Sequence, residues 1–189
     1  LDNNSSDSSI DIVKHFVRDK SLKNLAKKSY TNIKIKKINN YSPGYSLNEG
    51  VKIASNNIIM VISSHCVIKK FKFDNLLSNL KTYDCIFGNQ IPVYYGKRMS
   101  KRYVWSHFVD KKIINMYSNL EKRYFIHNAF AIYKKNILKR IPFNENLVGK
   151  EDRYWANTYI NKGKKYLYDN TLVVEHHYTQ NGNTWKGLA

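Results

Sequence analysis

Short apolar segments alternate with amphipathic helical segments along most of this chain, and this alternation limits its fold more than any other feature. We expect helices at residues 8–19, 46–55, 73–82, 135–141 and 149–163, and strands at 32–38, 57–63, 83–89, 124–134 and 164–178. The segment 57–63 is a continuous apolar run, which is typical of a strand buried on both faces of a parallel sheet. The order predicts an α/β sandwich around a mostly parallel sheet.

The length of 189 residues fits a single domain, residues 1–189, that is large enough to bury a hydrophobic core. Hydrophobic residues make up 42% of the chain, which favours a globular over a disordered class. Both cysteines, Cys66 and Cys85, have apolar neighbours, so reduced core residues are the better interpretation. No segment is long and apolar enough to span a bilayer, and no signal peptide is recognisable.

The formal net charge is +18. The positive electrostatic field of such a chain favours anionic partners such as sugar nucleotides, acidic lipid surfaces or nucleic acid. Alternatively, the abundance of Lys alongside Asn, Ile and Tyr reflects AT-rich codon usage without selection for binding. Charge alone therefore identifies no partner.

Acidic residues are scarce, 14 in all, so the adjacent Glu151 and Asp152 at the start of an expected helix stand out. The helix dipole and backbone N–H groups favour carboxylates at this place. One of the two could deprotonate an acceptor hydroxyl while the other orients a neighbour. Acids in a first turn also commonly serve only as caps, and this structural role is the alternative.

Three histidines lie at expected strand ends. His65 belongs to Ser-Ser-His-Cys after the strand at 57–63, where open α/β sheets bind ligands. His176 and His177 end the last strand and could bind a metal or a phosphate. Successive residues of a strand point to opposite faces, so at most one of the two faces a given site. The alternative is that these are hydrogen-bonded surface residues.

Several segments, in order, resemble family 2 glycosyltransferases of the GT-A fold. They are "DNNSSDSS" (2–9), "PGYSLNEGVKIAS" (43–55), the apolar strand that follows, and "GKEDRYWANTYINKGKKYLYDNTLVVEHHY" (149–178). The resemblance covers nearly the whole chain. "SSHC" with "FGNQIP" (87–92), and later "ED" and "VEHHY", resemble a bacterial polysaccharide-synthesis branch in which Ser/Ala-His-Cys replaces Asp-x-Asp.

The resemblance implies a three-layer GT-A domain and an inverting transfer of a sugar from a nucleotide-diphosphate donor to an acceptor hydroxyl. It implies Asp152 as the catalytic base, preceded by Glu151. Asp2 or Asn3 would contact the donor base, and Asn48 would lie near the donor diphosphate. A hexosyl- or deoxyhexosyl-transferase of bacterial surface polysaccharide or lipopolysaccharide synthesis, with a saccharide or lipid-linked acceptor, fits this pattern.

Ser63, Ser64 and His65 match the Asp-x-Asp stretch, whose carboxylates hold Mg²⁺ or Mn²⁺ in this family. One alternative is that His65 stays a ligand together with His176 or His177, which suits Mn²⁺ better than Mg²⁺. The other is that no metal binds and that basic side chains neutralise the diphosphate. Candidates for contacts with diphosphate or acceptor are Lys97, Arg98, Lys101, Arg102 and Trp155.

The family's first strand and first helix have no counterpart in this sequence. We therefore expect an N-terminally truncated domain that exposes apolar surface and a free strand edge. The expected location is cytoplasmic, peripheral at the inner face of a bacterial membrane.

Two other classes compete with the enzyme. The stretch 94–108 interleaves bases and aromatics as single-stranded nucleic-acid surfaces do, but it follows no recognised RNA-binding pattern, so no nucleic-acid partner is expected. Tyr103, Trp105 and Phe108 beside Lys and Arg would suit an anionic membrane surface, unless they simply pack on the domain. A non-catalytic relative is the other alternative, and the presence of Glu151 and Asp152 speaks against it.

Overall fold

The computed structural model describes residues 1–18 and 33–178. The helices are α1 (Ser9–Arg18), α3 (Pro43–Ile53), α4 (Phe73–Thr82), η1 (Tyr103–His107), α5 (Lys135–Arg140) and α6 (Glu151–Asn161). The strands are β1 (Ile58–Ile62), β2 (Cys66–Lys70), β3 (Cys85–Tyr94), β4 (Lys97–Arg98), β5 (Ile113–Ile114), β6 (Tyr117–Ser118), β7 (Arg123–Tyr124), β8 (Phe130–Lys134) and β9 (Leu167–His177). None of the described helices is both long and apolar enough to cross a bilayer.

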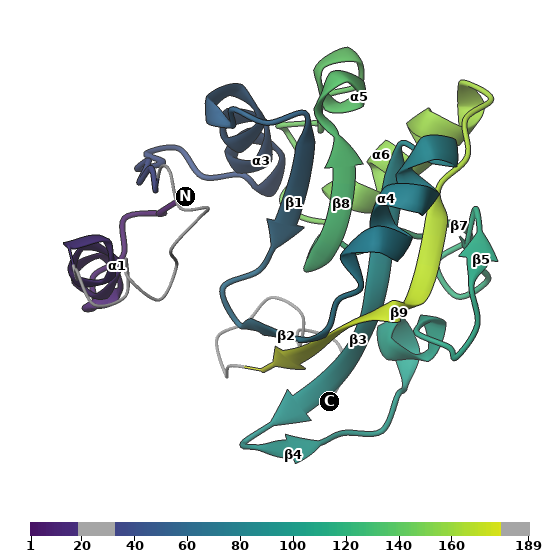
Figure 1. Ribbon diagram of the computed structural model, residues 1–189, viewed down its shortest axis with the longest axis horizontal. Helices are drawn as coiled ribbons and strands as arrows, with labels where there is room; N and C mark the ends of the chain where they lie inside the picture. Colours follow the sequence, from purple (N-terminus) through teal and green to yellow (C-terminus); the bar gives the residue numbers. More distant parts are fainter. Residues whose placement is uncertain (19–32, 179–189) are drawn as a thin grey trace.

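The central sheet has the strand order β1-β8-β3-β9-β2, with β4 beside β3 and β5 beside β9 (Figure 1). The predicted α/β class is confirmed, but the sheet is mixed. Of the strand pairs in the described residues, β3 and β9 run parallel, whereas β8 runs antiparallel to both of its neighbours. A continuous apolar run looks the same in either direction, so the sequence could not show which pairs are antiparallel.

Two apolar cores lie on opposite faces of this sheet. α4 packs Leu76 and Leu80 on one face, together with Ile86 and Ile132 of the sheet. On the other face α6 packs Trp155 against a larger cluster with Phe87 and Tyr133. Neighbouring residues of β3 and β8 thus alternate between the two cores, as strands covered on both faces require. The result is three layers, with α4 in front of the sheet and α6 behind it in Figure 1.

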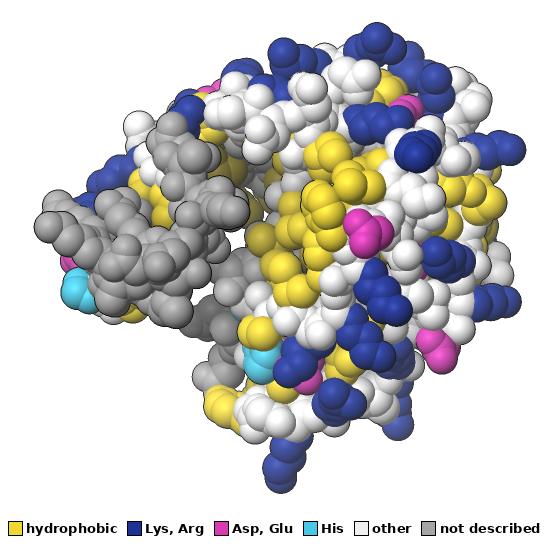
Figure 2. Space-filling view, in the orientation of Figure 1, with side chains coloured by type: hydrophobic (Ala, Val, Ile, Leu, Met, Phe, Trp, Pro, Cys, Tyr) yellow, Lys and Arg dark blue, Asp and Glu magenta, His cyan; other side chains and the backbone are white. Residues whose placement is uncertain are grey.

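β1 lies at an edge of this sheet. The sequence predicted a strand buried on both faces, and this is wrong: β1 pairs with β8 alone among the described residues, and Ile58, Met60 and Ile62 are 41%, 38% and 41% exposed. Figure 2 shows apolar side chains gathered on the face that carries β1 and α4, with Lys and Arg around them. Within residues 1–18 and 33–178, β1 thus leaves one strand edge unpaired and apolar side chains exposed.

α3 begins earlier than its pattern suggested. Tyr41–Tyr45 looked like a break, but Ser42 is the N-cap, its Oγ accepting a hydrogen bond from Tyr45 N at 3.1 Å, and Pro43 takes the first helical position. This is where proline fits a helix best. A side chain at Gly44 would lie 2.2 Å from the carbonyl oxygen of Asn144, so the glycine permits close packing of α3 on that loop.

The strand expected at 32–38 is reduced, in its described part, to one parallel bridge between Asp2 and Lys37. Two backbone hydrogen bonds form it, from Asp2 N to Lys36 O and from Ile38 N to Asp2 O. Ile38 is buried, whereas Ile33 and Ile35 are exposed. The alternating apolar residues of this segment therefore accompany one short backbone pairing and not a full strand.

The strand expected at 124–134 is divided in the structure. Tyr124 belongs to the two-residue β7, and the sheet strand β8 begins only at Phe130. Residues 125–129 leave the sheet and pass beside the start of α6, where Asn128 contacts Glu151 and Asp152. β2 was not predicted, because Cys66–Lys70 is short and ends in two lysines.

Candidate active site

Glu151 and Asp152 open α6, as the sequence predicted. The preceding Lys150 adopts a left-handed conformation, φ 61°, which turns the chain sharply into the helix. Both acids are buried, at 8% and 3% exposure. Both line an open cleft of about 880 Å³. A capping role on the surface would leave them exposed, whereas here both carboxylates lie in the wall of the cleft.

The two carboxylates have different partners. Asp152 accepts hydrogen bonds from the backbone N–H of Asn128 at 2.9 Å and from Arg153, whose Nη1 lies 2.8 and 2.9 Å from its two oxygens and whose N–H donates at 2.9 Å. The Glu151 carboxylate accepts one side-chain hydrogen bond among the described residues, from Asn128 Nδ2 at 3.2 Å. Asp152 is thus saturated and charge-paired, whereas Glu151 keeps acceptor capacity.

The surroundings of Glu151 change the pKa of its carboxyl group. Burial, and then the negative charge of Asp152, raises the pKa of Glu151 to about 7. A carboxyl group in this range can accept and release protons near neutral pH.

The cleft also holds residues that the sequence analysis missed. His127 and Asn128 line it from the loop before β8, and Arg123, Lys150 and Arg153 bring positive charge. Arg153 lies over the ring of Phe125 at 4.7 Å. The dipeptide His127-Asn128 just before an apolar run is a usable signal, but its apolar neighbours favour the interior of a strand, whereas the structure has a loop there. The arginines gave no signal in a chain so rich in basic residues.

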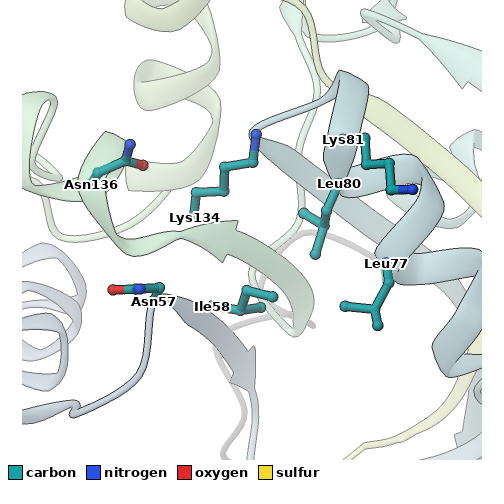
Figure 3. Close-up of a pocket in the computed structure, with 7 residues that line it drawn as sticks. All are labelled: Asn57, Ile58, Leu77, Leu80, Lys81, Lys134 and Asn136. Atoms are coloured by element: carbon teal, nitrogen blue, oxygen red, sulfur yellow. The ribbon is translucent and has the colours of Figure 1, made fainter.

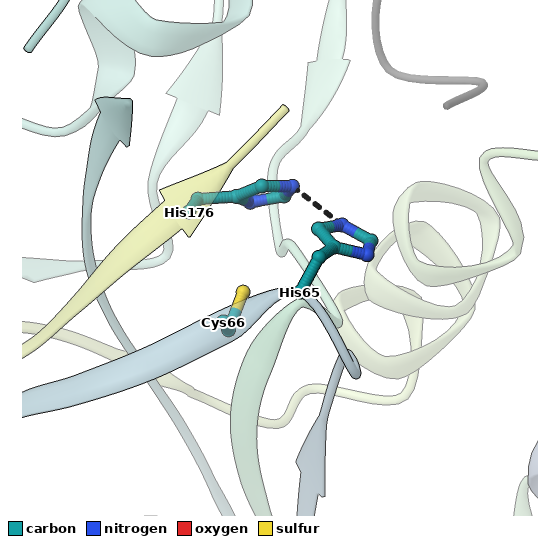
Figure 4. Close-up of side chains that lie close together, drawn as sticks. All are labelled: His65, Cys66 and His176. Atoms are coloured by element: carbon teal, nitrogen blue, oxygen red, sulfur yellow. Dashed lines mark hydrogen bonds between the residues drawn. The ribbon is translucent and has the colours of Figure 1, made fainter. Parts of the chain in front are cut away.

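His65 and His176 come together, 2.8 Å apart between their Nε2 atoms (Figure 4). His176 Nδ1 lies 2.9 Å from Oε1 of the buried Gln90. His177 points elsewhere, with its Nε2 3.9 Å from Glu175 and 40% of its side chain exposed. Of the two candidates at the end of β9, the structure thus brings only His176 to His65.

The pKa values of His65, His127 and His176 all lie below the ordinary value for histidine. Burial, followed by the neighbouring His127 and His65, lowers the pKa of His176 to about 2. Burial also lowers the pKa of His65. For His127 burial first, then Arg153, lowers the pKa well below its usual value. The rings of His127 and His176 lie 5.9 Å apart, so the His65–His176 pair adjoins the cleft through His127.

Asp2 and Asn3 differ in exposure. Asp2 is buried, and its Oδ1 accepts hydrogen bonds from Ser5 N at 3.1 Å and Ser5 Oγ at 2.5 Å. Its Oδ2 is buried without a hydrogen-bond partner among the described residues. Asn3 is exposed. Only Asp2 therefore offers a preorganised acceptor.

Asn48 does not have the role that the sequence suggested, which was a contact near the donor diphosphate. Its Nδ2 donates to Phe143 O at 2.9 Å and to Glu145 Oε1 at 2.8 Å, and its Oδ1 accepts from Phe143 N at 3.0 Å. The whole amide thus joins α3 to the loop after α5, which leaves no donor for a diphosphate.

The two serines of the matched triplet lie at different places. Ser63 lines the cleft, and its N–H donates to Ala129 O at 3.1 Å. Ser64 is exposed in the turn that follows.

Three further candidates do not reach the cleft. Lys97 and Arg98 are exposed on β4, where Arg98 Nη2 lies 3.4 Å from Glu175 Oε1. Trp155 is 2% exposed, donates from Nε1 to Ile141 O at 2.7 Å and stacks on Tyr159. It is a core residue, and its assignment to acceptor binding is wrong.

Two of the three aromatic side chains that were expected to suit a membrane surface are buried. Trp105 and Phe108 are 2% and 1% exposed, which shows that they pack on the domain. Tyr103 is exposed and lines the cleft. Lys101 donates to Phe108 O and to Asn89 Oδ1.

A second cavity, of about 470 Å³, lies between β1, α4 and the start of α5 (Figure 3). Its lining residues are Asn57, Ile58, Leu77, Leu80, Lys81, Lys134 and Asn136. None of the predicted site residues in the described ranges borders it, and it lacks an acid or a histidine. The chemistry therefore concentrates in the cleft at α6.

The fold is similar to that of TarS from S. aureus. Residues 1–349 of TarS in complex with UDP-GlcNAc match with a TM-score of 0.67 at 18% identity, over 98% of this chain and 50% of that one. The complex of the same TarS fragment with UDP matches with a TM-score of 0.62 at 19% identity, over 94% and 50%. This chain thus spans about half the length of these structures. Among curated proteins, no sequence matches it significantly.

Sequence comparison gives the family. The model described as glycosyl transferase family 2 matches residues 1–142, well over half of the chain. The match ends before Glu151, so the interpretation of the acidic pair depends on the geometry of the cleft. Together with the GT-A arrangement shared with TarS, the match confirms the predicted family, and the chain belongs to glycosyl transferase family 2.

Proposed function

We propose that this chain belongs to an enzyme that transfers a sugar, with inversion, from a nucleotide-diphosphate donor to an acceptor hydroxyl. The observation that carries the proposal is the buried Glu151–Asp152 pair in an open cleft of a family 2 chain. A buried acidic pair that only stabilised the helix would need no cleft beside it.

The proposed donor is a nucleotide sugar. The TarS structures with UDP-GlcNAc and UDP have a similar fold, which supports this class of donor without identifying the sugar. In this chain Asp2 Oδ2, which has no hydrogen-bond partner among the described residues, would accept an N–H of the donor base. Satisfying a buried acceptor in this way stabilises the bound nucleotide.

The acceptor proton passes to the acidic pair. The hydrogen bonds favour Glu151 as the recipient, because Asp152 is saturated by Asn128 and Arg153 whereas the pKa of Glu151 is about 7. Asp152 then supplies the negative charge that makes Glu151 a better base. This reverses the roles that the family resemblance implies.

The residues near Ser63–His65 do not fit Mg²⁺. That ion prefers oxygen ligands, and the donor group that the described residues offer here consists of His65, Cys66 and His176. No step of the reaction is therefore assigned to Mg²⁺. Arg123 and Lys150 line the cleft and would neutralise the departing diphosphate.

The proposal also covers the acceptor, the class of biosynthesis and the donor sugar. A saccharide or lipid-linked acceptor in bacterial surface polysaccharide or lipopolysaccharide synthesis, reached from the cytoplasmic side of the membrane, fits a family 2 chain with a net charge of +18. A hexose or deoxyhexose is the proposed donor sugar.

The first test is binding. We expect one of UDP, GDP and dTDP to raise the melting temperature of this chain, and Asp2→Asn to weaken that stabilisation by replacing an acceptor oxygen with an NH₂ group. Asp11→Asn, at a carboxylate 81% exposed, is the control. An unchanged melting temperature with all three nucleotides would contradict the donor assignment.

The second test separates the two carboxylates by release of the nucleoside diphosphate from the donor sugar. Glu151→Gln should abolish release and keep nucleotide binding. Asp152→Asn should keep partial activity and shift the rise of the rate with pH below 7, because the charge that raises the pKa of Glu151 is gone. Full activity in Glu151→Gln together with none in Asp152→Asn would make Asp152 the base. Nucleotide binding without release by the wild type would favour a non-catalytic relative.

A further inference from the structure

Three soft or borderline donor atoms converge beside the cleft. His65 lies in the turn between β1 and β2, Cys66 is the first residue of β2, and His176 lies near the end of β9 (Figure 4). One donor atom from each lies within 4.8 Å of the other two. Cys66 is directly opposite His176 in the antiparallel β2–β9 ladder, so both side chains stand on the same face of the sheet.

Gln90 orients His176. Its Oε1 is an acceptor, so the proton of the neutral imidazole is on Nδ1, which donates at 2.9 Å. The lone pair of Nε2 is thereby directed toward His65. Metal-binding histidines are generally held in this way by a carbonyl or carboxylate on their other nitrogen. Gln90 is fully buried, and its Nε2 has no hydrogen-bond partner among the described residues, so its Oε1–His176 contact is the one side-chain hydrogen bond seen for this amide there.

A hydrogen bond between two imidazoles would account for the 2.8 Å contact of His65 and His176. It leaves two features unexplained, the thiol on the same face and the buried Gln90 amide that holds the other ring nitrogen of His176. A single ion explains all of them. Since Zn²⁺ holds imidazole nitrogen at about 2.0 Å and thiolate sulfur at about 2.3 Å, its tetrahedral ligand atoms lie roughly 3–4 Å apart. Small side-chain rotations bring the present donors to that spacing.

We propose that His65 Nε2, Cys66 Sγ and His176 Nε2 bind a thiophilic divalent cation of the Zn²⁺ class, with a fourth position left open. Two imidazoles and one thiolate suit Zn²⁺ and Co²⁺ and disfavour Mg²⁺. The thiol proton passes to solvent when the metal–sulfur bond forms. Ser63 lines the cleft two residues before His65, so the ion would lie at its edge. A role beside the donor diphosphate depends on the proposed function, but metal binding itself does not.

Cobalt reports directly on this ligand set, because a Co²⁺–thiolate bond produces a charge-transfer absorption that nitrogen and oxygen ligands do not. We expect this absorption when the chain is titrated with Co²⁺, its loss when Zn²⁺ is added, and no loss with a large excess of Mg²⁺. Cys66→Ser should remove the absorption, whereas Cys85→Ala, at the other cysteine, should keep it. His176→Ala should abolish tight binding, and His177→Ala is its matched control.

Gln90 gives an independent test that leaves all three ligands in place. Gln90→Leu should lower Co²⁺ affinity by about 10–100-fold, as loss of the partner of a ligating histidine does. Wild type without the absorption, an unchanged absorption in Cys66→Ser, or displacement of Co²⁺ by Mg²⁺ would overturn the proposal. The titration needs no nucleotide, so its failure would leave the donor-binding result unaffected, and failure of donor binding would leave the metal site standing.

Discussion

Glu151 and Asp152 show how two adjacent acids in one chain acquire different chemistry. Both are buried, but Arg153 and the Asn128 backbone balance the charge of Asp152. Glu151 has the Asn128 amide and the charge of its neighbour, which together with burial favour its protonated form. Desolvation without a counter-charge raises the pKa of a carboxyl group.

This environment predicts an unusual pH dependence of stability. The pKa of Glu151 is about 7 in the folded chain and near 4.5 in the unfolded one, so the folded chain binds more protons between these values. Its stabilising contribution is present below about pH 4.5 and is lost as the pH rises through 7. We expect urea unfolding to show that wild type, relative to Glu151→Gln, loses on the order of 1–3 kcal/mol between pH 4.5 and pH 8.

Other carboxylates of the chain titrate in the same experiment, so the difference between the two proteins is the informative quantity. Asp11→Asn removes an exposed carboxylate and should follow the wild type at every pH. A wild-type minus Glu151→Gln difference that stays constant with pH would mean that the carboxyl has an ordinary pKa.

The residues with a strong chemical identity were predictable, and their partners were not. Glu151, Asp152, His65 and His176 follow from scarcity and from places at element ends. Arg153 and Asn128, which decide what the acids can do, come from a common residue type and from a loop mistaken for strand. Asn48 was singled out as a contact of the diphosphate, but its amide binds the backbone of Phe143. The sequence cannot distinguish these two roles, because a helical asparagine can serve either.

At the level of elements, helices were easier to predict than strand pairing. α4 spans 73–82 as expected, and α5 and α6 lie within their expected ranges, because amphipathic period and first-turn acids are local signals. The direction of β8 between β1 and β3 depends on contacts far apart in the sequence, which no local pattern records.

Asn48 connects elements that are remote in the sequence, and this gives a second prediction. Asn48→Ala would leave the buried N–H and C=O of Phe143 without their partners, so we expect the free energy of unfolding to fall by about 2–4 kcal/mol. Nucleotide affinity at temperatures where the variant is folded should stay within about twofold of wild type, a free-energy change under 0.5 kcal/mol.

Denaturant unfolding and nucleotide titration of the same samples check both parts. Asn136→Ala, at an exposed asparagine of α5, should change neither quantity. Wild-type stability together with lost nucleotide binding would restore the donor contact that the family resemblance implied for Asn48.

Across the whole molecule, the two edges of the main sheet are protected unequally. β2, at one edge, carries Lys69 and Lys70, and charged side chains on an edge strand oppose pairing with another chain. β1, at the other, reads Ile-Ile-Met-Val-Ile without a charge. The net charge of +18 provides a general repulsion between copies, which salt screens.

This imbalance predicts that the chain self-associates through β1 and that association increases with salt. Adding salt weakens the repulsion between copies while the apolar strand edge stays available, so light scattering at fixed protein concentration should rise with ionic strength. Met60→Lys places a charge in the middle of β1 at a side chain already 38% exposed, and we expect it to suppress the rise without lowering the melting temperature appreciably. Val67→Lys adds the same charge to β2, where lysines already lie, and should change the scattering little. Equal suppression by both variants would mean that net charge alone governs association, and scattering that falls with salt would exclude the β1 edge as its cause.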